Sequence, residues 1–213
     1  MGEISLNRPP RLMVACIGSD FMEGVADSVK RMVEHFAQKT GGHYNVVVQE
    51  SLIALPPLGL GAMRNFQVMR AVEQDYDYLM LLDNDVLLED PLIAFKLITR
   101  NKPYIVPWFD QSGLGNVHRI ADPMYERDQG LLQLAWTTPF CNLIEVNSFR
   151  LTGLRPFSDN LLYCEDEYNS QFFRVNGVSI WQDTDVHVKL LRGPTMLWEH
   201  LKELKPVKPK GTP

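Results

Sequence analysis

The sequence lacks any long apolar run. None of its apolar segments approaches the roughly 20 residues that a membrane-spanning helix needs. The first twenty residues show no basic stretch followed by an apolar one, so we expect no secretory signal. With hydrophobic residues at 45% and charged residues at 22%, the 213 residues have an ordinary globular composition and a length that suits one large domain.

Cysteine is scarce, and acidic residues outnumber basic ones by 26 to 21. The three cysteines, Cys16, Cys141 and Cys164, are an odd number without CxxC spacing. They predict free, buried thiols in a reducing compartment, and therefore a cytoplasmic protein. The formal net charge of −5 argues against a general nucleic-acid ligand, which needs a basic surface. An anionic ligand held through a metal remains compatible with this charge.

Strand and helix patterns alternate through the first half of the chain. Compact apolar runs at 11–18, 44–51, 78–82 and 103–109 are typical of buried strands, and the segments between them show helical spacing. This rhythm predicts an α/β fold with a mostly parallel, doubly wound sheet.

The second half of the sequence follows a different pattern. Residues 110–130 lack periodicity and predict a long loop. Strand material is expected at 134–149 with a break at Pro139, then a helix at 164–175 and strands at 178–181 and 184–190. We expect a short arm at 1–10, a single domain at 11–200, and a disordered Lys/Pro-rich tail at 201–213.

Two carboxylates interrupt the apolar stretch DYLMLLDNDVLLEDP. Asp83 and Asp85 follow the third expected strand, and open parallel sheets bind ligands beyond the carboxyl ends of their strands. Because neighbouring carboxylates repel each other, a cation between them favours the arrangement. Mg²⁺ or Mn²⁺, held together with substrate phosphates, suits such oxygen ligands. The same string is also typical of a plain polar turn, and these residues alone leave both interpretations open.

Two further segments carry candidate polar groups. Strand alternation in TDVHVKLL places His187 on the polar face, which favours a ligand or a solvent-exposed role, and imidazole is a competent third ligand for Mn²⁺. Glu165, Asp166 and Glu167 occupy the first turn of an expected helix. Acidic residues there also stabilise the helix through its dipole, so nothing local identifies a catalytic base.

Four motifs in order resemble a known family. GAMRN (61–65), DYLMLLDND (77–85), CEDEYNSQFFRVNG (164–177) and VHV (186–188) are together similar to a GT-A-fold glycosyltransferase of the family 2-like group, over roughly residues 11–192. The resemblance implies a Rossmann-like GT-A fold, with a nucleotide-sugar-binding half at 11–109 and an acceptor-binding half at 110–200. It implies a hexosyltransferase that uses Mn²⁺ or Mg²⁺, with a UDP-sugar as the first expected donor and a GDP-sugar as the second. The acceptor would be a hydroxyl of a glycan, a protein or a small molecule.

The resemblance also implies the metal ligands. By position, Asp85 and His187 would be the principal ligands of the metal that bridges the donor diphosphate. Asp83 would contact the ribose or assist through water. A metal in this position stabilises the charge that develops on the leaving nucleoside diphosphate.

Other positions receive nucleotide or catalytic roles from the same resemblance. Arg64 and Asn65 would face the nucleobase or phosphates, and Glu50 is the counterpart of an acidic nucleobase contact, although its surroundings differ from the usual family pattern. Asp166 would be the general base that deprotonates the acceptor, with Glu165 beside it, which gives inversion at the sugar carbon. Retention of configuration stays open.

Two other classes of protein remain as alternatives. One is a metal-dependent phosphatase or sugar nucleotidyltransferase, since haloacid-dehalogenase-type phosphatases also use a D-x-D string after an apolar strand. In haloacid-dehalogenase-type phosphatases, however, that motif normally ends the first strand of the domain, and here two strand–helix units precede it. The other alternative is a non-catalytic sugar-binding relative.

Overall fold

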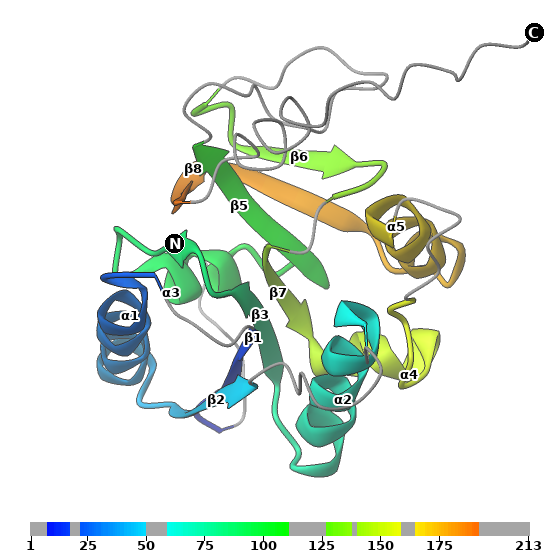
Figure 1. The fold of residues 1–213 in the computed structure, drawn as a ribbon, viewed down its shortest axis with the longest axis horizontal. Coiled ribbons are helices and arrows are strands. Elements are labelled where there is room, and N and C mark those ends of the chain that lie inside the picture. The colour runs from blue at the N-terminus through cyan, green and yellow to red at the C-terminus, as the bar shows by residue number, and fades with distance from the viewer. Residues whose placement is uncertain are drawn as a thin grey trace, which may run out of the picture.

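The computed structural model describes residues 8–17, 22–49, 59–110, 127–137, 140–158 and 165–191. Within these ranges a mixed sheet forms the centre of the molecule, with helices on both sides (Figure 1). Its strands are β1 (Arg11–Ile17), β2 (His43–Gln49), β3 (Tyr78–Asp83), β4 (Val86–Leu87), β5 (Tyr104–Asp110), β6 (Leu131–Leu134), β7 (Cys141–Glu145) and β8 (Ile180–Leu190). The helices are α1 (Val25–Thr40), α2 (Leu60–Glu73), α3 (Ile93–Thr99), α4 (Phe149–Thr152) and α5 (Glu165–Val175), with a 3₁₀ turn η1 (Val146–Ser148) before α4.

The strands are arranged in the order β2-β1-β3-β7-β5-β8-β4, and β6 pairs with β8 beside this path. Strands β1, β2, β3, β5 and β8 run in one direction, whereas β4, β6 and β7 run in the other. The predicted α/β class with a mostly parallel central sheet is confirmed. The carboxyl ends of the five co-directional strands therefore meet at one edge of the sheet.

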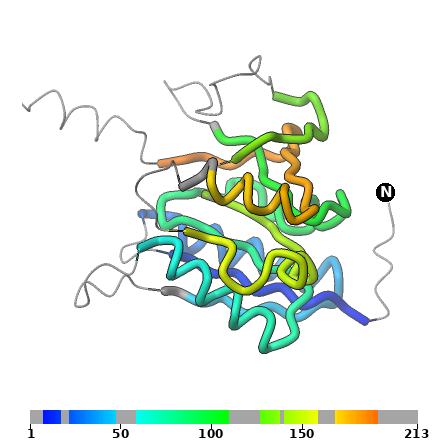
Figure 2. The backbone as a smooth tube through the Cα atoms, turned by 90° about the vertical axis from the view of Figure 1, so that its right-hand side faces the viewer, coloured from blue at the N-terminus to red at the C-terminus, as the bar shows by residue number. Residues whose placement is uncertain are grey.

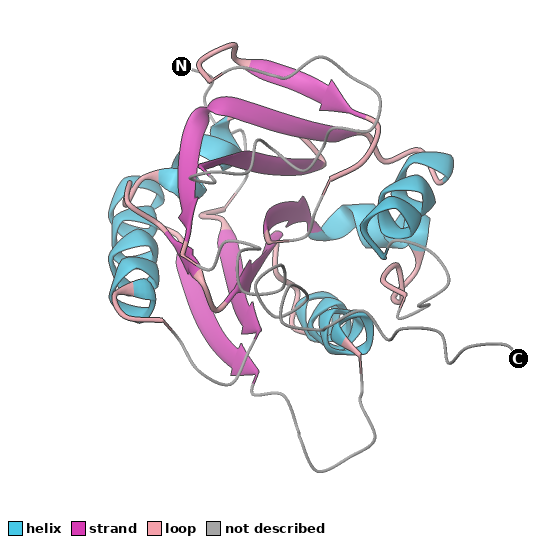
Figure 3. Ribbon diagram, turned by 45° about the horizontal axis from the view of Figure 1, so that its top comes forward, coloured by secondary structure: helices cyan, strands magenta, loops and turns pink. Residues whose placement is uncertain are grey.

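Both faces of the sheet are buried, which explains the continuous apolar runs. Along β1, Val14 and Cys16 pack in the core cluster that contains α1 and α3, whereas Met13 and Ala15 pack in the cluster that contains α2. Figure 3 shows α1 on the opposite side of the sheet from α2 and α5, and Figure 2 shows α2 and α4 running close together. Each fully buried apolar side chain contributes about 1.5–3 kcal/mol.

The turn between α1 and β2 depends on two glycines. Gly41 caps α1 in the left-handed conformation, with φ of 63°, and its N–H donates to the Ala37 carbonyl. At Gly42, an added Cβ would collide with the carbonyl oxygen of Pro10. The predicted end of this helix at Gly41-Gly42 is confirmed, because only glycine allows the chain to pass so close to its neighbour.

The second half of the chain differs in detail from the sequence expectation. β8 is one continuous strand where two were predicted, and it carries an irregularity: Pro107 pairs with Asp183 but Trp108 pairs with His187. Residues 146–149 form a 3₁₀ turn and the start of α4, so the prediction of strand there was wrong. The proposed long loop, apart from its ends, and the C-terminal tail lie outside the described residues. None of the helices in the described part of the chain is both long and apolar enough to cross a membrane.

Candidate active site at the carboxyl edge of the sheet

Asp83 ends β3 at the edge where the co-directional strands finish. It lies beside Ile17, the last residue of β1. Leu79 and Leu81 pack in the core cluster around α2, and Asp83 continues their alternation onto the same face. The strand therefore directs the Asp83 carboxylate towards α2.

Arg64 of α2 meets this carboxylate. The Arg64 side chain is 2% exposed, and its Nη2 donates to Asp83 Oδ1 over 3.4 Å, while the Asp83 side chain is 19% exposed. A guanidinium needs a nearby anion when it is buried, because an isolated buried charge is costly. Arg64 thus reduces the negative charge at the strand end.

The backbone of the Asp83-Asn84-Asp85 turn is bonded to three distant segments. The Asp83 N–H donates to the Phe140 carbonyl over 2.9 Å, and the Asn84 carbonyl accepts from the Met22 N–H over 3.1 Å. The Asp85 carbonyl accepts from the Leu191 N–H over 2.9 Å. Because each residue of the turn is held, the positions from which the two carboxylates extend are set before a ligand arrives.

Asn65 links this region to the segment that leads towards α5. Its Nδ2 donates to the Phe157 carbonyl over 2.7 Å, and its Oδ1 accepts from the Phe157 N–H over 3.0 Å. Sequence reasoning placed Asn65 against the nucleotide, but in the structure both ends of its amide bind the backbone of one residue. Two neighbouring residues of α2 therefore make different connections. Arg64 contacts Asp83 at the end of β3, and Asn65 binds the backbone of Phe157.

Helix α5 begins at Glu165, so Asp166 lies in its first turn, as the sequence predicted. The helix is held by Phe173, which makes edge-to-face contacts with Tyr104, Phe149 and Phe157 at centroid distances of 4.9, 6.3 and 5.8 Å. Asn169 Oδ1 also accepts from the Ser158 N–H over 2.9 Å. The side chains of Glu165 and Asp166 lie outside the described part of the structure, as does all of Glu50.

His187 is not brought next to Asp85. Leu191, the residue after β8, donates its N–H to Asp85, and His187 lies four residues earlier, which is about 13 Å along the chain. The side chains alternate as predicted, with Val186, Val188 and Leu190 buried.

The imidazole of His187 has both nitrogens engaged. Nε2 lies 2.7 Å from the Thr184 carbonyl oxygen, which only accepts, and Nδ1 lies 2.7 Å from Arg127 Nη2, which only donates. The ring is therefore the Nε2–H tautomer, with its lone pair directed at Arg127. In this arrangement neither nitrogen has a lone pair left for a metal.

The partners of His187 were not found from the sequence. Trp108 packs edge-to-face on the imidazole at 5.6 Å, and the Arg127 guanidinium lies 5.1 Å from the centre of the Trp108 ring. The β-strand pairing of Trp108 with His187 brings them together, and it depends on the irregularity in β8. No local sequence signal predicts such a shift of register.

A second D-x-D string, Asp183-Thr184-Asp185, lies in β8 at this irregularity. Arg100 donates through Nε and Nη2 to Asp183 over 2.6 and 3.2 Å, and through Nη2 to Asp185 over 3.0 Å. Hydrogen bonding to Asp183 is the main cause that raises the pKa of Arg100. Asp185 also accepts from the Gly130 N–H over 3.0 Å. This string is a structural ion-pair network.

Two thiols lie one residue below Asp83 in the sheet. Cys16 and Cys141 pair with Leu82 from opposite sides, and both are buried and free, as predicted. Burial raises the pKa of Cys16 to about 12, and burial together with the charge of Asp83 raises the pKa of Cys141 further. Thiols with such pKa values stay neutral and do not act as nucleophiles.

The oxygen ligands at the end of β3 limit which metal ion suits this site. Among the described residues, no three His, Cys, Asp or Glu side chains converge on a point that could hold a metal ion. Asp83 and Asp85 offer oxygen atoms at an accessible edge. Such a pair fits Mg²⁺ or Mn²⁺, which bind one or two carboxylates and take other ligands from phosphates and water. Two carboxylates do not make a closed site in which protein side chains supply every metal ligand.

Comparisons with known proteins identify the fold. No family model matches the sequence, and no curated protein matches it. The structure is similar to A197 from STIV (TM-score 0.53, 14% identity, 84% of this chain and 94% of that chain). It is also similar to the catalytic domain of Drosophila beta1,4-galactosyltransferase 7, with a TM-score of 0.56, 13% identity, and coverage of 88% of this chain and 73% of that chain.

A third similar structure is GalNAc-T7 with UDP, GalNAc and Mn²⁺, with a TM-score of 0.55, 12% identity, and coverage of 86% of this chain and 43% of that one. At such identities the likeness concerns the fold. The chain has an α/β fold like that of GT-A-type glycosyltransferases, as the resemblance of the motifs implied.

Proposed function

We propose that this chain is a metal-dependent glycosyltransferase that moves a sugar from a nucleotide-sugar donor to an acceptor hydroxyl. The observation that carries the proposal is the carboxylate pair Asp83 and Asp85 at the carboxyl end of β3, with the buried Arg64 directed at it. Solved glycosyltransferases with this fold support the proposal, and the structure of one of them, GalNAc-T7, contains UDP, GalNAc and Mn²⁺.

Asp83, Asp85 and Arg64 form the donor side of the proposed site. The two carboxylates would hold the cation, and the Arg64 guanidinium would bind a phosphate oxygen of the donor. Bound there, Mn²⁺ or Mg²⁺ would act as a Lewis acid towards the diphosphate. The backbone hydrogen bonds of the turn keep both carboxylates in place, which reduces the entropy lost when the donor binds.

Asp166 is the proposed base on the acceptor side, with Glu165 beside it. A carboxylate at the start of α5 would accept the proton of the attacking hydroxyl while the sugar–phosphate bond breaks, and direct attack from the opposite face inverts the sugar carbon. The position of α5 supports this assignment, since Asn65 and Asn169 both bond the segment at Phe157 and Ser158. That segment connects α5, through Asn169, to the helix that carries Arg64.

We assign the metal to Asp83 and Asp85 without His187. To bind a metal, His187 would have to release Thr184 and Arg127 and approach the strand end from about 13 Å along β8. Substitution of His187 by alanine tests this assignment directly: it should leave the Mn²⁺ dependence of donor binding unchanged. Glu50 stays the proposed contact to the nucleobase.

A thermal-shift experiment tests the function. The full chain is heated with UDP-, GDP-, CMP- and dTDP-sugars, each with and without Mn²⁺. A ligand that binds only the folded state raises Tm, so we expect one donor class, with UDP-sugars first, to raise Tm only when the metal is present.

Enzyme assays then separate the proposal from its alternatives. We expect release of the nucleoside diphosphate to increase when a hydroxyl acceptor is added. Hydrolysis of simple phosphate esters without any donor binding would indicate the phosphatase, and formation of a nucleotide-sugar from a nucleoside triphosphate would indicate the nucleotidyltransferase. Either result would overturn the proposal.

A further inference from the structure

Strand β2 forms one end of the sheet order and pairs, among the described strands, with β1 alone. Its sequence, HYNVVVQ, contains no proline and no Asp, Glu, Lys or Arg over seven residues. Proteins usually protect an edge strand with charge, proline or a bulge, because its free N–H and C=O groups can pair with another chain. β2 carries none of these protective residues.

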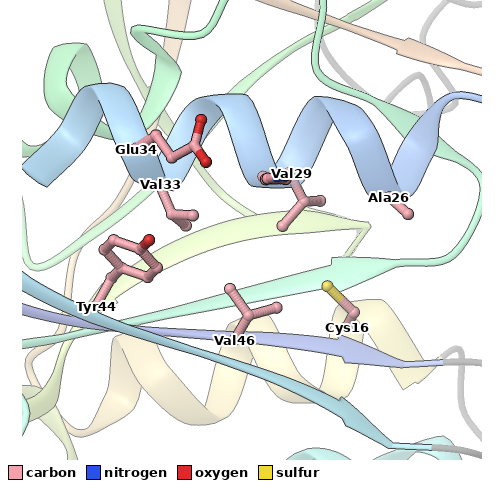
Figure 4. A pocket seen from close by; sticks show the side chains of 8 residues that line it. Cys16, Ala26, Val29, Val33, Glu34, Tyr44 and Val46 are labelled. Carbon is pink, nitrogen blue, oxygen red and sulfur yellow. The ribbon is translucent and has the colours of Figure 1, made fainter.

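The α1-facing side of this edge is apolar and open. A cavity of about 290 Å³ lies between α1 and the β1–β2 pair, lined by Cys16, Ala26, Val29, Lys30, Val33, Glu34, Tyr44 and Val46 (Figure 4). Tyr44 is 43% exposed and Val46 is 37% exposed, although both are strand residues directed towards the helix. Helix α1 therefore leaves the outer part of this face uncovered.

The hydrogen bond at His43 shows which residues of β2 direct their backbone N–H and C=O groups towards β1. The His43 N–H donates to the Pro10 carbonyl, which continues the β1 side of the pairing. Backbone groups alternate along a strand, so the N–H and C=O groups of Tyr44 and Val46 point away from β1, towards the open edge. These same two residues carry the exposed apolar side chains.

We propose that β2 is the dimer interface of this protein, at which a second copy adds its own β2 in antiparallel orientation around a two-fold axis at Asn45. In this register Tyr44 faces Val46 of the second copy, and each pair exchanges two backbone hydrogen bonds. An aromatic residue opposite a β-branched one is a favourable cross-strand pair. The two sheets become one continuous sheet, and the open side of each cavity is covered by the other copy.

The charged side chains of α1 are also arranged so that the two-fold axis at Asn45 brings opposite charges together. Lys30 and Glu34 are both exposed, four residues apart, and both line the cavity. Figure 4 shows α1 running antiparallel to β2, with Val33 on the side of Tyr44 and Val29 on the side of Val46. The midpoint of the two charges thus lies above Asn45, and the two-fold axis directs Lys30 towards Glu34 of the second copy, twice. A second copy is complementary to this surface in backbone, apolar side chains and charge.

Disulfide trapping tests the axis. Asn45→Cys places two thiols on the two-fold axis at a non-hydrogen-bonded pair, where the Cα atoms are about 4.5 Å apart and within the range that a disulfide spans. His43→Cys is the matched control on the same strand, because the proposed register separates its two copies by about 13 Å. We expect mild oxidation to cross-link Asn45→Cys into a dimer and to leave His43→Cys monomeric. Equal cross-linking of both variants, or none of either, would overturn the proposal.

A charge exchange on α1 tests the same register without cysteines. Lys30→Glu and Glu34→Lys each turn two attractive contacts into repulsive ones, so each should weaken dimerisation about tenfold in sedimentation velocity, equal to about 1.4 kcal/mol. The double exchange, Lys30→Glu with Glu34→Lys, should restore the dimer. Lys39→Glu, on the same helix outside the cavity, should have no effect. Monomeric wild-type protein at every concentration, or no recovery in the double variant, would refute the interface.

Discussion

The chain contains two D-x-D strings with opposite surroundings. Asp83 and Asp85 lie at the end of β3, where Arg64 Nη2 lies 3.4 Å from Asp83 Oδ1. Asp183 and Asp185 lie within β8, where Arg100 contacts both carboxylates at 2.6–3.2 Å and Asp183 is completely buried. The string in the interior is neutralised by the protein itself, whereas the string at the strand end stands where a ligand can enter.

This difference shows what a short acidic motif does and does not indicate. The spacing of the carboxylates is the same in both strings, so spacing alone does not separate a binding site from a structural ion pair. Position in the sheet separates them, because ligands bind beyond the carboxyl ends of parallel strands and not in the middle of one. The following predictions test this division between binding and stability.

The largest expected effect is on activity. Asp85→Ala should lower kcat/KM for sugar transfer about a thousandfold, in the range found when one charge-stabilising group is removed from an active site. Asp185→Ala is the matched change in the other string and should stay within about threefold of wild type. Steady-state kinetics with the donor identified by thermal shift measures both. Similar losses in the two variants would remove the distinction between the strings.

Stability should depend on the buried member of the second string, Asp183, more than on its exposed member, Asp185. Asp183→Ala leaves Arg100 without its bidentate partner and should lower the free energy of unfolding by about 3 kcal/mol. Asp185→Ala should cost less than about 1 kcal/mol, since that side chain is 42% exposed and its ion pair is screened by solvent. Urea denaturation of the two variants measures the difference. If Asp183→Ala were as stable as Asp185→Ala, the interior string would not be the structural one.

Substitution of Asn65 tests whether this side chain stabilises the fold or binds the nucleotide. Asn65→Ala removes both hydrogen bonds to the Phe157 backbone and should cost about 2 kcal/mol of stability, because two polar backbone groups lose their partner. Gln74→Ala, at the exposed end of the same helix, is the control and should change little. Urea denaturation gives both values. A loss of donor affinity with unchanged stability would instead support the nucleotide contact that the sequence suggested.

A smaller change in stability is expected from substitution of Glu145, which lies beside the opposite end of β3. Burial raises the pKa of Glu145, which pairs with Tyr78. The folded state then binds more protons than the unfolded state as pH rises from the ordinary glutamate value to the raised one, so stability falls across that window. Glu145→Gln removes this loss and should stabilise the protein by about 0.5 kcal/mol at neutral pH, since the half-buried group keeps some solvent screening.

Urea denaturation at two pH values checks this prediction. The difference between Glu145→Gln and wild type should disappear near pH 4, on the order of the ordinary glutamate pKa, where the carboxyl is mostly protonated in both states. A difference that stays constant with pH would show that the charge of Glu145 is not its cause.

The sequence predicted those features that depend on local pattern. The buried runs of β1 and β3 follow from apolar residues that pack on both faces of the sheet, and the end of α1 follows from Gly41 and Gly42. Asp83 was correctly placed at the end of its strand, because the apolar run stops there.

Features that depend on distant contacts were not predictable in this way. The engagement of Asn65 with Phe157 joins residues far apart in the chain, and the tautomer of His187 depends on a register shift in β8 and on Arg127. The network of Arg100 with Asp183 likewise depends on how α3 packs beside β8. Each of these contacts follows from tertiary packing, which a motif in one segment of the sequence does not predict.

The turn that carries Asp83, Asn84 and Asp85 has a consequence for how the protein folds. Its backbone bonds reach Met22, Phe140 and Leu191, so parts of the chain from near the start, the middle and the end of the described residues must all be in place. Contacts of such long sequence separation form slowly, because the intervening loops must close first. During synthesis the carboxylates would reach their final positions only after β8 has left the ribosome, so a nascent chain that ends before β8 would lack the finished turn on which the proposed donor site depends.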